Sequence, residues 1–192
     1  VAEGFPSVNL LRTDDSDVVS VALNNSKGSE LGVDYLINKG RKRIAFLQGQ
    51  EYLQLYRDRF QGYRNALEKH NIEYDESLVW QGFQNGEFSA EKEVEKRLKS
   101  GPEVDAIFCA SDNLAVSTLH TLRQMRYSIP EDIAVIGYDN VPISELLYPR
   151  LTSIGQPFKE MGRKAINVLI DMIEGRDIGE DRNFIFDPYL LI

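Results

Sequence analysis

The stretch that decides the fold of this chain is Ile129-Pro-Glu-Asp-Ile-Ala-Val-Ile-Gly-Tyr-Asp139-Asn140. Its residues 133–138 form an unbroken apolar run with β-branched members, which is typical of a strand buried on both faces inside a parallel sheet. Asp139 and Asn140 follow where this strand ends, and open α/β sheets bind ligands beyond the carboxyl ends of their strands. On spacing alone, a plain turn explains these two polar residues equally well.

Working outward from this stretch, short apolar runs alternate with segments of helical periodicity. The runs predict strands at residues 8–11, 18–23, 43–47, 78–80, 105–109 and 184–192, with an irregular polar and aromatic loop at 81–88. Helices are expected after residues 24–26, around residues 60–70, after the N-caps Ser89 and Ser111, and from residue 159 to about 174. Short connections between alternating strands and helices predict an α/β fold with a parallel sheet and helices on both faces.

Composition and motifs narrow the class of function. The formal net charge of the 192 residues is −8, and the absence of a long basic run disfavours direct binding to a phosphate backbone. The single cysteine, Cys109, excludes an internal disulfide, and no apolar stretch approaches membrane-spanning length. The sequence lacks a phosphate loop, a dinucleotide glycine fingerprint, a zinc-protease motif and a serine elbow. A binding module that needs no cofactor or metal is therefore expected, rather than an enzyme.

Polar side chains gather at the predicted strand ends, where they suit a hydroxylated small molecule. Carboxylates and amides exchange hydrogen bonds with hydroxyl groups, arginine offers a rigid fork of donors, and aromatic rings stack on apolar ring faces. The candidates are Asn24, Asn25, Gln48, Arg57, Arg59, Gln84, Ser111, Asp112, Asp139 and Asn140, with the aromatic residues Tyr52, Tyr56, Phe83 and Phe88. Helix capping is the favoured alternative for Asp112, and packing is the alternative for the aromatic residues.

Several motifs in order resemble the effector-binding core of lactose-repressor-type (LacI/GalR) transcription regulators. The similarity covers residues 18–192. It is carried by Gly28-Ser-Glu-Leu-Gly32, Gly40-Arg-Lys-Arg-Ile-Ala-Phe-Leu-Gln-Gly49, Arg59-Phe-Gln-Gly62-Tyr63, Asp105-Ala-Ile-Phe-Cys-Ala-Ser-Asp112, the opening stretch, and Pro149-Arg-Leu-Thr-Ser-Ile-Gly-Gln-Pro157.

The resemblance implies a two-lobed, periplasmic-binding-protein-like (type I) fold with the ligand between the lobes. Residues 1–23 and 154–185 would belong to an N-terminal lobe that is only partly present, and residues 24–153 with 186–192 to the C-terminal lobe. A lobe without further sheet neighbours would expose the helix that carries Ile166 and Ile170. By the family's motifs, Arg59 and Asp139 hold the effector, and the remaining expected ligand contacts are Ser111, Gln84, Phe83 and Asn24.

The function that the resemblance implies is that of a cytoplasmic, dimeric sensor of a sugar-like effector. Operator DNA would be bound through an N-terminal head that this sequence does not contain, and no membrane partner is expected. Tyr148 and Leu119 would lie at the dimer interface. The alternative is a periplasmic sugar-binding protein of a transport or chemotaxis system.

Overall fold

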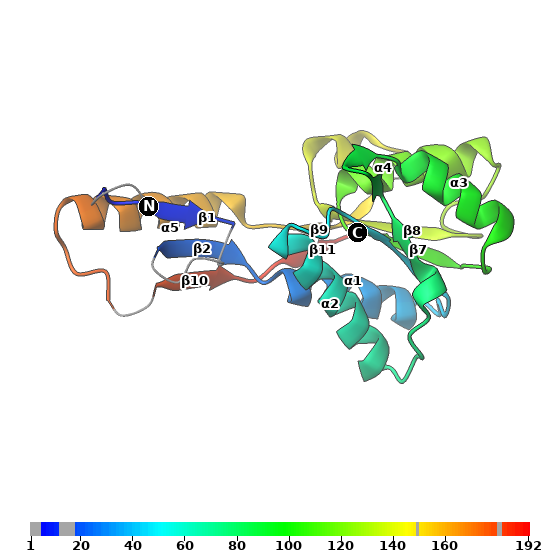
Figure 1. Cartoon of the computed structure of the whole chain (residues 1–192), viewed down its shortest axis with the longest axis horizontal. Helices are drawn as coiled ribbons and strands as arrows, with labels where there is room; N and C mark the ends of the chain where they lie inside the picture. Colours follow the sequence, from blue (N-terminus) through cyan, green and yellow to red (C-terminus); the bar gives the residue numbers. More distant parts are fainter. Residues whose placement is uncertain (1–4, 12–17, 149, 180–181) are drawn as a thin grey trace. The chain divides into compact units, whose positions relative to one another are not determined.

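The chain divides into two compact units, shown in Figure 1. The computed structural model describes residues 5–11, 18–148, 150–179 and 182–192. Unit 1 comprises Val1–Asn24 and Gln156–Pro188, and unit 2 comprises Asn25–Gly155 and Tyr189–Ile192. None of the helices in the described part of the chain combines the length and the apolar character needed to cross a membrane.

Unit 1 is built on a three-stranded parallel sheet. Its central strand is β2 (Val19–Leu23), flanked by β1 (Val8–Leu10) and β10 (Asn183–Phe186). All five residues of β2 are buried, as a largely apolar sequence predicts for a central strand, and the hydroxyl of its one polar residue, Ser20, donates to Asn183 Oδ1 at 2.6 Å. Helix α5 (Phe158–Ile173) packs on β1 and β2.

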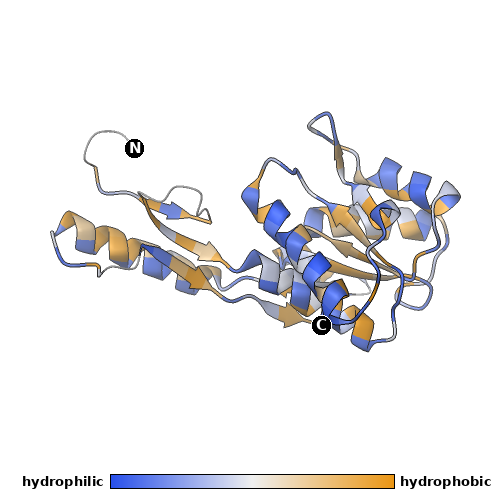
Figure 2. Ribbon diagram, turned by 60° about the horizontal axis from the view of Figure 1, so that its bottom comes forward, coloured by the Kyte–Doolittle hydropathy of each residue, from blue (hydrophilic) through white to orange (hydrophobic). Residues whose placement is uncertain are grey.

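Helix α5 is rich in apolar residues, as the orange of its ribbon in Figure 2 shows, and only some of them are buried. Met161 and Val168 are buried, whereas Ile166 and Ile170 are 60% and 42% exposed. The predicted helix is therefore confirmed, and Ile166 and Ile170 lie outside the buried face that Met161 and Val168 contribute to the core of unit 1.

Unit 2 contains a six-stranded sheet in the order β11-β9-β8-β7-β3-β4. Five of these strands run parallel, and β11 at one edge runs antiparallel to β9. The strands are β3 (Ile44–Gln48), β4 (Val79–Gln81), β7 (Ala106–Cys109), β8 (Ala134–Asp139), β9 (Thr152–Gly155) and β11 (Tyr189–Leu191). The stretch that opened the sequence analysis supplies β8, which lies in the middle of the sheet and is buried from Val135 to Tyr138.

Helices cover both faces of the unit 2 sheet (Figure 1). Helices α1 (Asn25–Asn38) and α2 (Gln54–Lys69) pack together on one face, and α3 (Ala90–Ser100) and α4 (Asp112–Gln124) pack together on the other. The α/β fold with parallel sheets flanked by helices is thus confirmed. Side chains from both layers fill the core, including Phe46, Tyr63, Trp80, Phe108 and Leu122.

The segment predicted as an irregular loop at residues 81–88 is a hairpin. β5 (Phe83–Gln84) pairs antiparallel with β6 (Glu87–Phe88) around Asn85 and Gly86. Both turn residues have positive φ, at 51° and 81°, which is the conformation of a two-residue hairpin turn that Asn-Gly favours. The Asn-Gly pair was the signal in the sequence that the prediction missed.

The single strand predicted at residues 184–192 is two strands that belong to different units. β10 ends at Phe186 in unit 1, and β11 begins at Tyr189 in unit 2. Pro188 lies between them, and a proline has no backbone N–H to continue a ladder.

Neither serine predicted as a helix cap makes a capping hydrogen bond through its side chain. Ser89 and Ser111 occupy the N-cap positions of α3 and α4, but neither hydroxyl accepts from the first turn of its helix. The Ser89 hydroxyl is buried without a partner among the described residues. These serines were predicted correctly by position and wrongly by mechanism.

Candidate functional site

Arg59 and Asp139 meet at the carboxyl edge of the unit 2 sheet. Arg59 lies in the second turn of α2, and Asp139 is the last residue of β8. Arg59 Nη2 donates to Asp139 Oδ1 at 2.9 Å in an ion pair whose arginine side chain is 4% exposed and whose aspartate is 25% exposed. The structure therefore brings together the two residues to which the motifs assign effector binding.

Arg59 also makes hydrogen bonds and a ring contact with other residues of unit 2. Its Nε donates to Asn25 Oδ1 at 2.9 Å, and Nη1 donates to the carbonyl oxygen of Ala110 at 2.6 Å. The guanidinium carbon lies 3.6 Å from the centre of the Tyr138 ring, a cation–π contact. Because burying a charge is costly unless it is paired and hydrogen-bonded, these contacts offset the desolvation of Arg59. Arg59 is thus a structural centre of unit 2 as well as a candidate ligand contact.

Two glycines make this arrangement possible. A Cβ at Gly62 would lie 2.0 Å from the carbonyl oxygen of Ser26, so only a glycine lets α2 approach the first turn of α1 this closely. The close approach brings Arg59, three residues earlier on α2, within reach of Asn25. A Cβ at Gly28 would lie 2.1 Å from the hydroxyl of Tyr138, the ring beneath Arg59. These close contacts explain why glycine is needed three residues after Arg59 and again in the first turn of α1.

Tyr138 anchors the floor of the site as a neutral hydrogen-bond donor. Its hydroxyl donates to the carbonyl oxygen of Asn25 at 3.2 Å. Burial is the main cause that raises the pKa of this hydroxyl above its ordinary value, so it stays protonated. The apolar pattern predicts Tyr138 in a buried strand, and no feature of the sequence marks it as part of the site.

The backbone turns sharply where β8 delivers its carboxylate. Asp139 and Asn140 have φ values of 111° and 49°, in a region that residues other than glycine rarely adopt. Such conformations cost free energy and persist when the surrounding structure holds them, and they cluster at functional sites. A turn is one of the two alternative explanations for these residues. The backbone has positive φ at both, and the ion pair shows that the Asp139 side chain points toward Arg59.

Asp112 lies beside this turn and is not a helix cap. It is the first residue of α4, fully buried, and its carboxylate accepts hydrogen bonds from the Val141 amide and from the hydroxyls of Ser144 and Ser153. The favoured prediction for Asp112, capping of its own helix, is therefore wrong. All three donors lie far away in the sequence, and no local pattern points to them.

None of the described contacts of Ser111, Gln84 and Phe83, the next expected ligand contacts, is with the side chain of Arg59 or Asp139. Ser111 is buried directly after Ala110, whose carbonyl group meets Arg59. Gln84 Nε2 donates to Glu93 at 3.4 Å, and Phe83 packs edge-on against Phe88 at 5.4 Å, so the described contacts of this hairpin are not with Arg59 or Asp139.

Asn24 is the last residue of unit 1, and its backbone N–H donates to Phe186 at the end of β10. The asparagine that contacts Arg59 is the next residue, Asn25. Asn25 is among the polar candidates at the predicted strand ends but not among the expected ligand contacts.

The two residues expected at a dimer interface have opposite environments. Tyr148 is 91% exposed, whereas Leu119 is 3% exposed because it packs in the core of unit 2.

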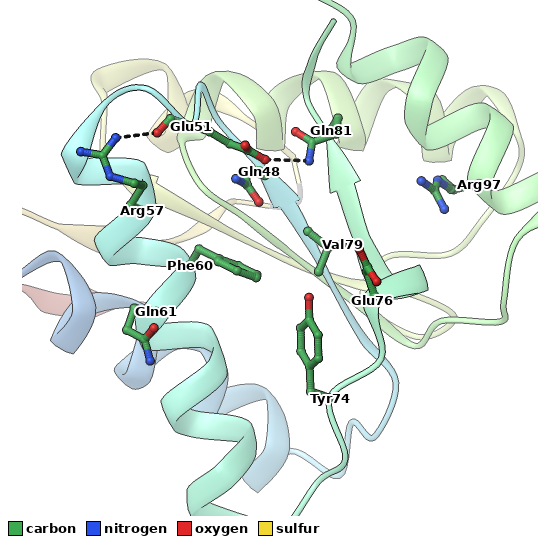
Figure 3. Close-up of a pocket in the computed structure, with 10 residues that line it drawn as sticks. All are labelled: Gln48, Glu51, Arg57, Phe60, Gln61, Tyr74, Glu76, Val79, Gln81 and Arg97. Carbon is green, nitrogen blue, oxygen red and sulfur yellow. Dashed lines mark hydrogen bonds between the residues drawn. The ribbon is translucent and has the colours of Figure 1, made fainter.

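A groove of about 690 Å³ lies along α2 and the edge strand β4 (Figure 3). Phe60, Tyr74 and Val79 provide apolar surface. Around its rim, Gln81 donates to the Glu51 carboxylate at 3.1 Å, and Arg57 donates to the Glu51 carbonyl oxygen at 2.7 Å. Arg57 and Gln48, two candidates from the sequence, therefore line this groove, and Arg59 and Asp139 do not.

Metal binding and thiol chemistry have little support in unit 2. Within the described residues, no three His, Cys, Asp or Glu side chains are grouped so that they could hold a metal ion. Cys109 is fully buried in β7, and burial raises the pKa of its thiol to about 12, so the nucleophilic thiolate is scarce at neutral pH.

Comparison with known proteins agrees with this architecture. Residues 33–189 match the family described as periplasmic binding protein-like domain. The chain is 34% identical over 181 residues to the HTH-type transcriptional regulator CelR of Thermobifida fusca, a match that covers 93% of this chain and 52% of CelR.

Solved structures of regulators superpose on the chain closely. The crystal structure of a LacI-family regulatory protein from Chloroflexus aggregans has a TM-score of 0.89 and 30% identity, covering 98% of this chain and 67% of that one. A CelR–cellobiose complex has a TM-score of 0.86 and 34% identity, covering 96% and 57%. The chain spans about half the length of the curated relatives it matches. The chain therefore belongs to the periplasmic binding protein-like domain family, in the form of the effector-binding domain of LacI-family regulators.

Proposed function

We propose that this chain is the effector-sensing and dimerising domain of a bacterial LacI-family transcriptional regulator. Its ligand is a small polar molecule, a sugar or sugar derivative, and ligand binding modulates the affinity for operator DNA of an N-terminal head outside this sequence. Because operator DNA is its target, such a regulator acts in the cytoplasm. The observation that carries the proposal is the ion pair of Arg59 and Asp139 at the carboxyl edge of the unit 2 sheet.

The chemistry of this pair favours a ligand with hydroxyl groups. A carboxylate accepts hydrogen bonds from hydroxyls, and charge-assisted bonds of this kind are about twice as strong as neutral ones. The guanidinium group of Arg59 holds the Asp139 carboxylate in one orientation, which lowers the conformational entropy that this side chain would lose when a ligand binds. The solved structure of a CelR–cellobiose complex supports the sugar class.

Pairing of two copies is supported by an exposed apolar surface on unit 2. Ile143, Leu146 and Tyr148 are 50%, 83% and 91% exposed within one short segment, which we call the 143–148 face. Palindromic operators match regulators with two-fold symmetry, so a dimer is the expected assembly. Leu119 contributes to the core beneath α4 rather than to this face.

The test is a binding titration by calorimetry with a panel of sugars that includes cellobiose, using the wild type, Asp139→Asn and Arg57→Ala. Replacing the carboxylate removes charge-assisted bonds worth about 1.5–3 kcal/mol, which corresponds to a Kd that is roughly 10- to 150-fold weaker. Arg57 lies on the same helix as Arg59, but it is exposed and lines the groove rather than the ion pair. The Arg57→Ala variant should therefore bind the sugar with the affinity of the wild type.

Two outcomes would count against the proposal. If Asp139→Asn binds a sugar with unchanged affinity while Arg57→Ala loses binding, the groove and not the ion pair holds the ligand. If no member of the panel binds the wild type at millimolar concentration, the sugar class is wrong. Because Trp80 is the only tryptophan and lies buried in unit 2, its fluorescence checks that each variant is folded.

A further inference from the structure

Asp112 sits at the junction of three segments that are remote in the sequence. Its Oδ2 accepts from the Val141 amide at 2.9 Å and from the Ser144 hydroxyl at 2.6 Å. Its Oδ1 accepts from the Ser153 hydroxyl at 2.6 Å. The start of α4, the segment after β8 and the strand β9 are therefore tied to one buried carboxylate.

The same network reaches the ligand-facing turn. The hydroxyl of Ser153 also accepts a hydrogen bond from the amide of Asn140 at 3.1 Å. The two amides that directly follow Asp139 therefore donate to Ser153 and to Asp112, respectively. The positive φ values of Asp139 and Asn140 make this turn costly by itself. These hydrogen bonds compensate for that cost and fix the direction in which β8 presents the Asp139 carboxylate.

The Asp112 carboxylate packs against β8 at Gly137, where the strand has no side chain. A Cβ at Gly137 would lie 2.1 Å from Asp112 Oδ1, so a glycine interrupts the apolar strand β8 where the carboxylate crosses it. The position of Asp112 at the first turn of α4 adds the positive end of the helix dipole, which favours a negative charge. Together with three hydrogen bonds, this environment offsets the cost of burying the charge.

The 143–148 face depends on the same anchor. Its residues Ile143 and Leu146 belong to η2 (Pro142–Leu146), a five-residue 3-10 helix flanked by the Val141 amide and containing Ser144. Such short helices have poor hydrogen-bond geometry of their own. The segment is therefore held mainly by its contacts with the rest of unit 2, and Asp112 supplies two of them.

We infer that Asp112 is a positioning residue that joins the ligand-facing turn at Asp139 to the 143–148 face, so that a displacement of one is passed to the other. The inference rests on the proposed function, in which Asp139 contacts the effector and the 143–148 face pairs two copies. The coupling element is the run of residues 139–144, in which the Asp112 carboxylate binds the Val141 amide and the Ser144 hydroxyl directly and the Asn140 amide through Ser153.

The experiment compares Asp112→Asn, Ser144→Ala and a matched control, Asp105→Asn, in the complete chain. Asp105 is a carboxylate of the same sheet that accepts from the amides of Lys42 and Arg43 at 2.8 and 3.0 Å, outside the network. Hydrogen exchange of the amides of residues 140–148 is measured against those of β3, and the dimer dissociation constant is measured by analytical ultracentrifugation. Ser144→Ala deletes a single donor and covers the case in which Asp112→Asn does not fold.

In Asp112→Asn and Ser144→Ala, we expect exchange at residues 140–148 to be about tenfold faster or more, because local opening is set by the hydrogen bonds that hold a segment. We also expect dimerisation to weaken by about tenfold, with β3 protected as in the wild type. Asp105→Asn should change neither quantity. Equal loss of protection across the sheet, or wild-type exchange at residues 140–148, would overturn the inference.

A wild type that stays monomeric would refute the dimer of the proposed function. The exchange measurement would still decide whether Asp112 positions residues 140–148, so the two failures can be told apart.

Discussion

The replacement of Gly62 by alanine tests how the site is assembled. The added Cβ would lie 2.0 Å from the carbonyl oxygen of Ser26, which is 1.4 Å short of the 3.4 Å at which ordinary contacts begin. The obstructing atom belongs to the backbone of α1, so it cannot rotate away, and α1 and α2 must move apart. The hydrogen bond from Arg59 Nε to Asn25 Oδ1, at 2.9 Å, spans this same interface and would be stretched or lost.

The magnitude follows from two opposing effects. Alanine in a helix interior is favoured over glycine by about 1 kcal/mol. Overpacking of a rigid contact costs about 1–3 kcal/mol, and the loss of a hydrogen bond from a buried charged group costs about 1.5–3 kcal/mol more. We therefore expect Gly62→Ala to lower the free energy of unfolding of unit 2 by about 1.5–5 kcal/mol, as the balance of these terms.

The assay is urea unfolding followed by the fluorescence of Trp80, which reports on unit 2. Gly162→Ala is the matched control, because Gly162 lies inside α5, and among the described residues no atom outside the adjoining turns of its own helix comes within 4 Å of an added Cβ. This control should be neutral or stabilising by up to about 1 kcal/mol, measured by circular dichroism. If Gly62→Ala is as stable as the wild type, the close approach of α1 and α2 is not what places Arg59.

Two further predictions concern the buried groups of unit 2. Tyr138→Phe keeps the ring beneath Arg59 and deletes the hydroxyl bonded to Asn25, so urea unfolding should show a loss of about 0.5–1.5 kcal/mol, and an unchanged stability would contradict the role of the hydroxyl. Burial raises the pKa of the Cys109 thiol from 9.0 to about 12, so the folded chain keeps a proton that the unfolded chain releases. Stability from this group is complete well below pH 9, begins to fall near pH 9, and approaches a loss of about 1.4 kcal/mol per pH unit above it. Relative to Cys109→Ala, the chain that carries the thiol should lose about 1.2 kcal/mol between pH 8.5 and 10, and parallel pH profiles would refute this.

Apolar runs and turn signals were sufficient for most of the fold. The run at residues 133–138 predicted β8, and the residues that follow it predicted a turn, because a strand buried on both faces leaves a strong local pattern. The misplaced elements have local causes as well. The Asn-Gly pair at residues 85–86 marked a hairpin that was overlooked, and Pro188 marked the break between β10 and β11.

The partners of the polar site residues were beyond the sequence. Asp112 has the local pattern of a helix cap, yet it binds Val141, Ser144 and Ser153, which lie 29, 32 and 41 residues further along the chain. Composition and spacing record which donors and acceptors exist, and they do not record which of them the folded sheet brings within 3 Å.

By itself, the sequence determined most of the order of strands and helices and the strand end at which Asp139 lies. These features are local, since they follow from the periodicity of apolar residues and the conformational preferences of single residues. The motif that contains Arg59 and Gly62 was identified through the family resemblance and not through periodicity. Only the tertiary structure decided that Arg59 is buried as a structural centre and that Asp112 anchors the segment beside Asp139. The physical reason is that buried charges must find partners across the fold, and the packing of helices on the sheet selects those partners.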